Sequence, residues 1–121
     1  MRQFLTLALV SLTAIVGMPP QARAASLYFN RTPIKASSER VCYTFAADTA
    51  RLEGFQNVHK NALEVAGTKD GAYVSITCVG RGNQPALAIV MSVADSFDIA
   101  RRVADSAANR IKGIVCFDSC Q

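Results

Sequence analysis

The sequence holds four cysteines, the residue type that most often carries redox or metal chemistry in a small protein. They are Cys42, Cys78, Cys116 and Cys120. None belongs to a Cys-x-x-Cys pair, and the C-x3-C spacing of the last two suits no common set of metal ligands in a chain with one histidine. Residues 1–24 follow the plan of a secretory signal peptide, and an even number of cysteines in an exported chain is typical of two disulfides. We therefore expect structural disulfides and no metal site.

The single histidine, His59, is the only side chain of the kind that usually serves as a general base. The apolar spacing predicts a helix over residues 49–66, with His59 on its apolar arc and no acid among its near helical neighbours. A catalytic histidine needs a nucleophile or a carboxylate beside it. We expect no catalytic residue and no cofactor. The alternative is a small redox or hydrolytic enzyme that uses His59 or the Cys116/Cys120 pair.

Polar side chains that could bind a ligand lie on a predicted β-hairpin, whose arms are residues 72–79 and 86–93. The first arm alternates apolar with polar residues, so one of its sides faces solvent, whereas the second arm is apolar at nearly every position and should be more central. The turn places Arg81 between two glycines, without a phosphate-binding loop pattern. The expected binding residues are Tyr73, Ser75, Thr77 and Arg81.

The remaining elements flank this hairpin and predict an α+β fold. Alternation over residues 40–46 predicts a strand, helical spacing predicts helices over 49–66 and from Ser96 to Gly113, and residues 114–117 predict a last strand. With right-handed crossovers this order gives the ferredoxin-like βαββαβ sandwich, an antiparallel four-stranded sheet with two helices on one face. Metal chaperones and acylphosphatases share this topology, but their marker motifs are absent here, and fold alone assigns no function.

The expected sheet order, 4-1-3-2, has two consequences for the cysteines and the edges. The first and last strands would be neighbours, which favours a Cys42–Cys116 disulfide and leaves Cys78 for Cys120, although four cysteines allow three pairings. Residues 72–79 would form an exposed edge strand. Such an edge could pair with a second copy of the chain, giving an edge-strand homodimer.

The N-terminus and the charge set the expected location and partners. Residues 1–24 follow the plan of a cleaved secretory signal peptide, residues 25–39 read as a flexible lead-in, and residues 40–121 as one α+β domain. The mature chain would carry eleven Lys or Arg against nine Asp or Glu, too weak an excess to predict binding to nucleic acid or to a membrane. We expect a periplasmic or secreted bacterial protein. Its expected role is a non-enzymatic binding module of the cell envelope, whose partner is a protein or an envelope component.

Overall fold

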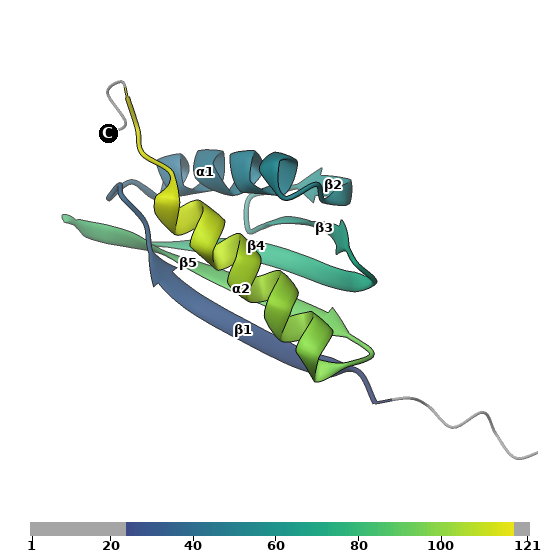
Figure 1. Cartoon of the computed structure of the whole chain (residues 1–121). Coiled ribbons are helices and arrows are strands. Elements are labelled where there is room, and N and C mark those ends of the chain that lie inside the picture. The colour runs from purple at the N-terminus through teal and green to yellow at the C-terminus, as the bar shows by residue number, and fades with distance from the viewer. Residues whose placement is uncertain (1–23, 118–121) are drawn as a thin grey trace, which may run out of the picture.

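The computed structural model of the chain describes residues 24–117, which form an antiparallel five-stranded sheet covered on one face by two helices (Figure 1). Residues 1–23 of the predicted signal peptide, and Cys120, lie outside the described residues. The strand order across the sheet is β1-β5-β4-β3-β2. The strands are β1 (Ser26–Pro33), β2 (Gln56–Lys60), β3 (Val65–Lys69), β4 (Ala72–Arg81) and β5 (Gln84–Ala94).

Each of the two helices, α1 (Glu39–Leu52) and α2 (Phe97–Gly113), begins after a serine. The hydroxyl oxygen of Ser38 accepts a hydrogen bond from the backbone N–H of Val41 at 3.3 Å. Ser96 does the same for Ile99 at 3.1 Å. These hydroxyls satisfy amide groups that the first helical turn leaves unpaired, which fixes where each helix starts.

The α+β class, the hairpin of β4 and β5, and helix α2 were predicted correctly, but the ferredoxin-like arrangement is not what the chain adopts. Residues 40–46 lie in α1 rather than in a strand, and residues 56–60 and 65–69 form strands rather than a long helix. The expected lead-in contains β1, which pairs with β5 along its whole length. The expected last strand, 114–117, does not join the sheet.

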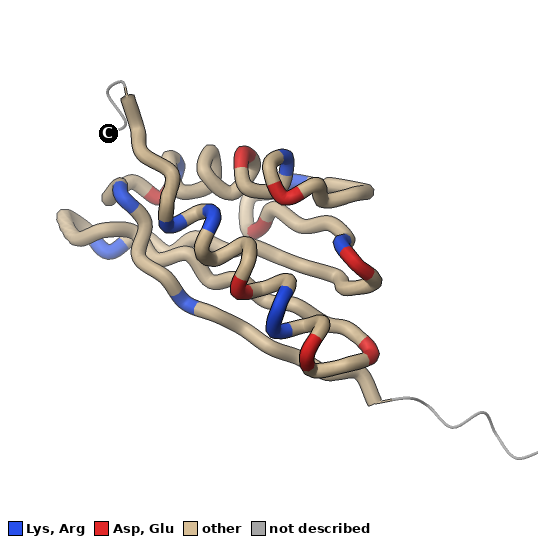
Figure 2. Tube along the Cα trace, viewed as in Figure 1, with Lys and Arg blue, Asp and Glu red and all other residues tan. Residues whose placement is uncertain are grey.

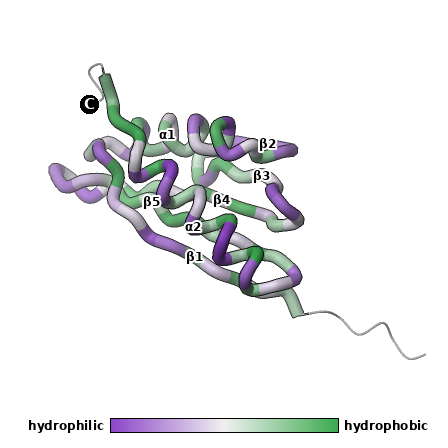
Figure 3. The backbone as a smooth tube through the Cα atoms, in the orientation of Figure 1, coloured by the Kyte–Doolittle hydropathy of each residue, from purple (hydrophilic) through white to green (hydrophobic). Residues whose placement is uncertain are grey.

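This strand order also corrects the expected edge. Strand β4 lies between β3 and β5, so residues 72–79 are central and cannot form an edge-strand homodimer. The edges are β1 and β2. Figure 3 shows hydrophobic residues running along β4 and β5, in agreement with their central position.

The helices pack on the sheet through small residues. On β5 the side chains that face the helices are short, and the buried face of α2 is mostly alanine. Small side chains on both layers allow helix and sheet to pack closely. The buried residues on this side of β5 are Ala86, Ala88, Val90, Ser92 and Ala94, and those of α2 are Ala100, Val103, Ala104, Ala107, Ala108 and Ile111.

A disulfide joins the two layers, but with a pairing other than the one expected. Cys42 of α1 is bonded to Cys78 of β4, and both residues are buried. The Cys42–Cys116 and Cys78–Cys120 pairs are therefore wrong, because residues 40–46 form a helix that lies over β4 rather than a strand beside the C-terminus. Cys116 is also disulfide-bonded, and no described cysteine is free.

Gly67, which would directly follow the helix predicted over residues 49–66, instead lies where strands β2 and β3 come close. A Cβ atom at this position would lie 2.7 Å from the backbone oxygen of Gln56 and 3.1 Å from Cβ of Phe55. A side chain does not fit there without moving the backbone. The helix α1 instead ends at Leu52 with Glu53 as its C-cap, and the next residue, Gly54, has a positive φ of 71°, which costs glycine little.

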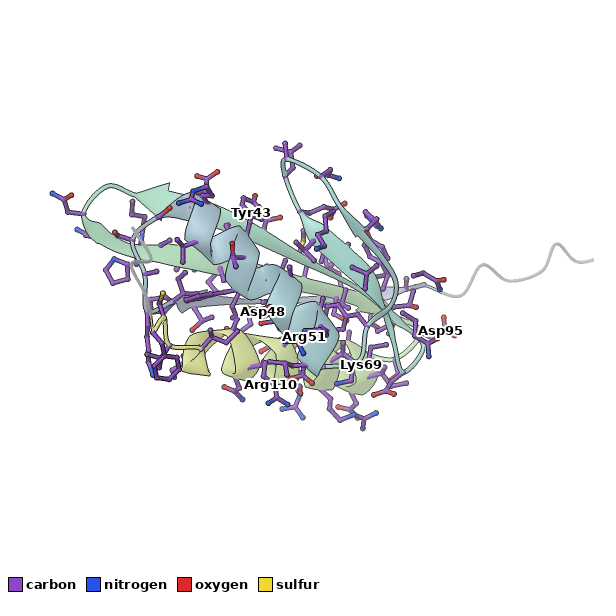
Figure 4. All side chains as sticks on the ribbon, turned by 90° about the horizontal axis from the view of Figure 1, so that it is seen from above. Tyr43, Asp48, Arg51, Lys69, Asp95 and Arg110 are labelled. Atoms are coloured by element: carbon purple, nitrogen blue, oxygen red, sulfur yellow. A yellow bond between two sulfur atoms is a disulfide. The ribbon has the colours of Figure 1, made fainter. Side chains whose placement is uncertain are left out.

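One buried carboxylate connects the C-terminal end of α1 to both its neighbours. Glu53 pairs with Lys69 at 2.7 Å and with Arg110 at 3.5 Å, and accepts a hydrogen bond from Ser106 at 3.0 Å. Lys69 and Arg110 approach this end of α1 from β3 and α2 (Figure 4). Burial raises the pKa of Glu53, but the bonds from Lys69 and Ser106 outweigh it, so the pKa is lowered.

The surface charges are mixed in sign. Lys and Arg lie between Asp and Glu along α2 and across the rest of the described chain (Figure 2). Among residues 24–117, none of the helices has the length and apolar character needed to cross a membrane.

Candidate binding face

The sheet has a second face that neither helix covers, here called the open face. It consists of the side chains that alternate with those facing the helices on β1, β5, β4 and β3, together with His59 of β2. The strand register arranges them in four cross-strand rows. The rows are Leu27–Val93–Tyr73–Thr68, Phe29–Met91–Ser75–Ala66–His59, Arg31–Ile89–Thr77 and Pro33–Leu87–Val79.

Large apolar side chains gather on the β1 and β5 half of this face. Leu27 is 56% exposed and Phe29 is 54% exposed, and Met91 is also exposed. Leu87, Ile89 and Val93 are half-buried. A monomeric protein rarely leaves a contiguous apolar patch of this kind uncovered, and such patches commonly mark interaction surfaces.

The other half of the open face carries a polar cluster around Glu64, here called the Glu64 cluster: His59, Glu64, Tyr73 and Ser75. One carboxylate oxygen of Glu64 lies 3.2 Å from Nε2 of His59 and accepts a hydrogen bond from the Tyr73 hydroxyl at 3.5 Å, while the other accepts one from Ser75. The rings of His59 and Tyr73 are stacked with centroids 6.3 Å apart. These contacts hold Glu64 over Ser75, which is only 4% exposed although no helix covers it.

The electrostatics of the cluster favour an ionised carboxylate. The hydrogen bonds from Ser75 and His59 lower the pKa of Glu64. Burial, followed by the charge of Glu64, raises the pKa of Tyr73, so the phenol keeps its proton.

In this cluster Glu64 accepts hydrogen bonds that fix its neighbours, and the side chains are not arranged as a nucleophile with its base. The carboxylate lies between His59 and Ser75, so each of them bonds to Glu64, and Ser75 is buried away from any substrate. A serine nucleophile needs the histidine itself within hydrogen-bonding reach. Within residues 24–117, no group of three or more His, Cys, Asp or Glu side chains is placed to hold a metal ion.

Asn61 explains why Glu64 points to this face. Its side-chain oxygen accepts hydrogen bonds from the backbone N–H groups of Leu63 and Glu64 at 2.8 and 3.0 Å, forming a tight turn between β2 and β3. Tyr43 of α1 bonds to the carbonyl oxygen of Leu63 at 2.9 Å and ties the same turn to the helix layer. Glu64 then precedes the buried Val65 and lies on the opposite side of the sheet.

The structure brings together three of the four expected binding residues. Tyr73, Ser75 and Thr77 share the open face of β4, as the alternation indicated. Arg81 does not join them, because it lies at the far turn of the hairpin, where its guanidinium donates to the carbonyl oxygen of Pro85 at 2.8 Å. Sequence reasoning missed Leu27, Phe29 and Glu64. Tyr28, Phe29 and Thr32 are residue types that are enriched in strands, and they were the signal that could have revealed β1.

A shallow hollow of about 630 Å³ opens at one end of the sheet, between the β3–β4 turn and the segment that joins β5 to α2. Asp70, Asp95 and Tyr73 lie on its wall, as does Glu53. The carboxylate of Glu53 is already paired with Lys69 and Arg110. Glu53 is therefore engaged within the fold, whereas Asp70 and Asp95 make the rest of the wall acidic.

These features define a small α+β domain with one helix-covered and one open sheet face. No protein-family model matches the sequence, and neither does any curated protein. Among solved structures, the solution structure of an AHSA1-like protein from Rhizobium etli is similar with a TM-score of 0.38 and 11% sequence identity, over 81% of this chain and 91% of that one. A similarity this weak assigns neither family nor function.

Proposed function

We propose that the chain is a non-enzymatic binding module of the cell envelope, exported to an oxidising compartment, which binds a partner protein through the open face of its sheet. The observation that carries the proposal is the placement of side chains on β5. Its large residues, Leu87, Ile89, Met91 and Val93, lie on the open face, whereas its alanines face the helices. Residues this large gain most by burial, at about 25 cal/mol per Å² of apolar surface, and the fold does not bury them fully.

The Cys42–Cys78 disulfide supports the proposed location. It is buried between the helix layer and the sheet, where it acts as a structural cross-link. Structural disulfides persist in the periplasm and outside the cell and are rare in the reducing cytosol. The signal peptide predicted at the N-terminus would deliver the chain to such a compartment.

An enzyme that uses His59 or the Cys116/Cys120 pair is the second candidate, and the geometry favours it less. His59 bonds to Glu64, and no nucleophile is seen within its reach among the described residues. Turnover of a substrate that is lost in a His59→Ala variant, with folding unchanged, would support this candidate.

Affinity capture from envelope extract tests the proposed function, with the tagged chain at native expression level as bait. Phe29→Glu places a charge in the apolar half of the open face, and Leu52→Glu is the matched control, because Leu52 is similarly exposed at the end of α1. We expect a specific partner protein that Phe29→Glu loses and Leu52→Glu retains. No specific partner, or equal capture by both variants, would contradict the proposal.

A further inference from the structure

We propose that the partner on the open face is a second copy of this chain, so that two sheets pack face to face about a two-fold axis that runs along the strands between β5 and β4. This inference rests on the proposed function and names the partner. Two sheets packed face to face in this way form the two layers of a β-sandwich. In such a dimer β1 of one copy lies over β3 of the other, and β5 lies over β4.

Charge placement selects this axis. Arg31 is exposed on β1 in the row that continues through Ile89 to Thr77. Glu64 directly precedes Val65, which pairs with Ile76, so Glu64 extends the same row on the far side of β4. A two-fold axis along the strands keeps the rows aligned. It therefore places Arg31 of each copy over Glu64 of the other, and forms two ion pairs in one symmetric interface.

The apolar groups complement one another under the same symmetry. The bare half of one copy, with Leu27 and Phe29, covers the stacked rings of His59 and Tyr73 on the other. Those rings already cover part of their own sheet, whereas Leu27 and Phe29 have no cover. In the dimer, the exposed apolar side chains on the β1 half of each copy are thus covered by the stacked rings of the other copy.

The area is sufficient for a specific dimer. Three of the four overlapping strands contribute about seven residues each and β3 contributes five. At about 4.8 Å between strands and about 3.4 Å per residue, they project roughly 420 Å² from each copy. The relief of the side chains adds to this projection. Two copies would then bury more than about 1,000 Å² of accessible surface, within the lower range of specific protein interfaces.

A charge-swap experiment on the full-length chain, with its disulfides oxidised, tests this geometry by sedimentation equilibrium at low salt. Arg31→Glu and Glu64→Arg should each weaken self-association at least about tenfold, because each homodimer then opposes like charges. An equimolar mixture of the two variants should recover dimers, since the first contributes two acids and the second two bases. Recovery only on mixing would support the proposed axis.

Glu64→Arg removes the carboxylate that accepts the hydrogen bonds of the Glu64 cluster, and this change could loosen the β2–β3 turn. A second variant therefore tests the dimer without disturbing that turn. Met91→Glu leaves that cluster intact and charges the centre of the open face. It should abolish self-association, while Leu52→Glu on α1 should not change it. Circular dichroism of each variant checks that it is folded.

Three results would overturn the dimer. The first is a wild-type chain that stays monomeric at every concentration, and the second is self-association that Met91→Glu leaves unchanged. The third is a mixture of the two folded charge-swap variants that forms no dimers. Pairing through the β1 edge would give the last result, because it does not bring Arg31 to Glu64. If the wild-type chain is monomeric but its open face captures another protein, the dimer fails and the proposed function stands. If it captures nothing, both fail.

Discussion

The two faces of the sheet differ in the size of their apolar residues, because on β5 the larger ones lie on the open face and the smaller ones lie under the helices. On β5, the face under the helices carries three alanines, a valine and a serine, whereas the open face carries leucine, isoleucine, methionine and valine. A free monomer gains nothing from placing its larger apolar residues toward solvent. The helix-covered face therefore holds most of the buried core, and the exposed apolar residues of the open face support our proposal that this face contacts a partner.

The largest expected effect on stability comes from removing the Cys42–Cys78 disulfide on the helix-covered face. Replacing both Cys42 and Cys78 by alanine should lower the free energy of unfolding by about 4 kcal/mol, because the bond closes a loop with a sequence separation of 36 residues. Urea unfolding of the double variant measures this loss. A change below about 1 kcal/mol would show that the helix layer is held to the sheet without the disulfide.

Two neighbouring residues of β5 compare the faces directly. Val90 is fully buried under the helices, and Met91 is exposed on the open face. Val90→Ala should cost about 2 kcal/mol through a cavity, whereas Met91→Ala should cost less than about 1 kcal/mol in the monomer, although it removes more atoms. Thermal unfolding at a dilution that favours the monomer checks this order, and a reversed order would contradict our assignment of the faces.

Two carboxylates extend the comparison to polar groups. Glu53 has a side chain only 7% exposed on the covered side, and Glu64 has a more exposed one on the open face. Glu53→Gln leaves Lys69 and Arg110 without their partner and should cost about 1–2 kcal/mol, a value reduced by the exposure of both cations. Glu64→Gln should cost less than about 1 kcal/mol. Equal losses would show that both sites are solvated alike.

The smallest effect is the dependence of stability on pH. Both glutamates have a lowered pKa in the folded chain, so each contributes stability above its ordinary pKa of about 4.5. That stability is lost as the pH falls through the folded-state values. A double Glu53→Gln, Glu64→Gln variant should show a shallower loss of melting temperature between neutral and acid pH than the wild type. An identical slope would mean that other carboxylates carry the effect.

The sequence was informative where a single periodicity dominated. The hairpin arms and α2 each show one clear pattern with serine or turn residues at the boundary, and the structure confirms them. Segment 40–46 satisfies two patterns. Val41, Tyr43 and Phe45 alternate like a strand, but the buried pairs Val41–Cys42 and Phe45–Ala46 recur at helical spacing. Ser38 caps the first turn and favours the helix, and the sequence prediction did not use this N-cap.

The candidate site was predicted in part for the same reason. Alternation on β4 was enough to place Tyr73, Ser75 and Thr77 on one side. Their partners come from elsewhere: Leu27 and Phe29 lie on β1, which pairs with β5 across more than fifty residues of sequence, and Glu64 reaches Ser75 from the next strand. Local patterns do not specify which strands become neighbours, so the extent of the open face was visible only in the structure.

The central claim is that the open face is covered when the protein works, and side-chain accessibility measures this directly. Hydroxyl-radical footprinting with mass spectrometry compares the chain in intact cells with the purified chain at high dilution. Phe29 and Met91 report on the open face, while Leu52 and Phe97 are exposed controls on the helix side. We predict several-fold lower oxidation of Phe29 and Met91 in cells and no change at the controls. If Phe29 and Met91, like the two controls, are oxidised to the same extent in cells as in the dilute purified chain, the claim is contradicted.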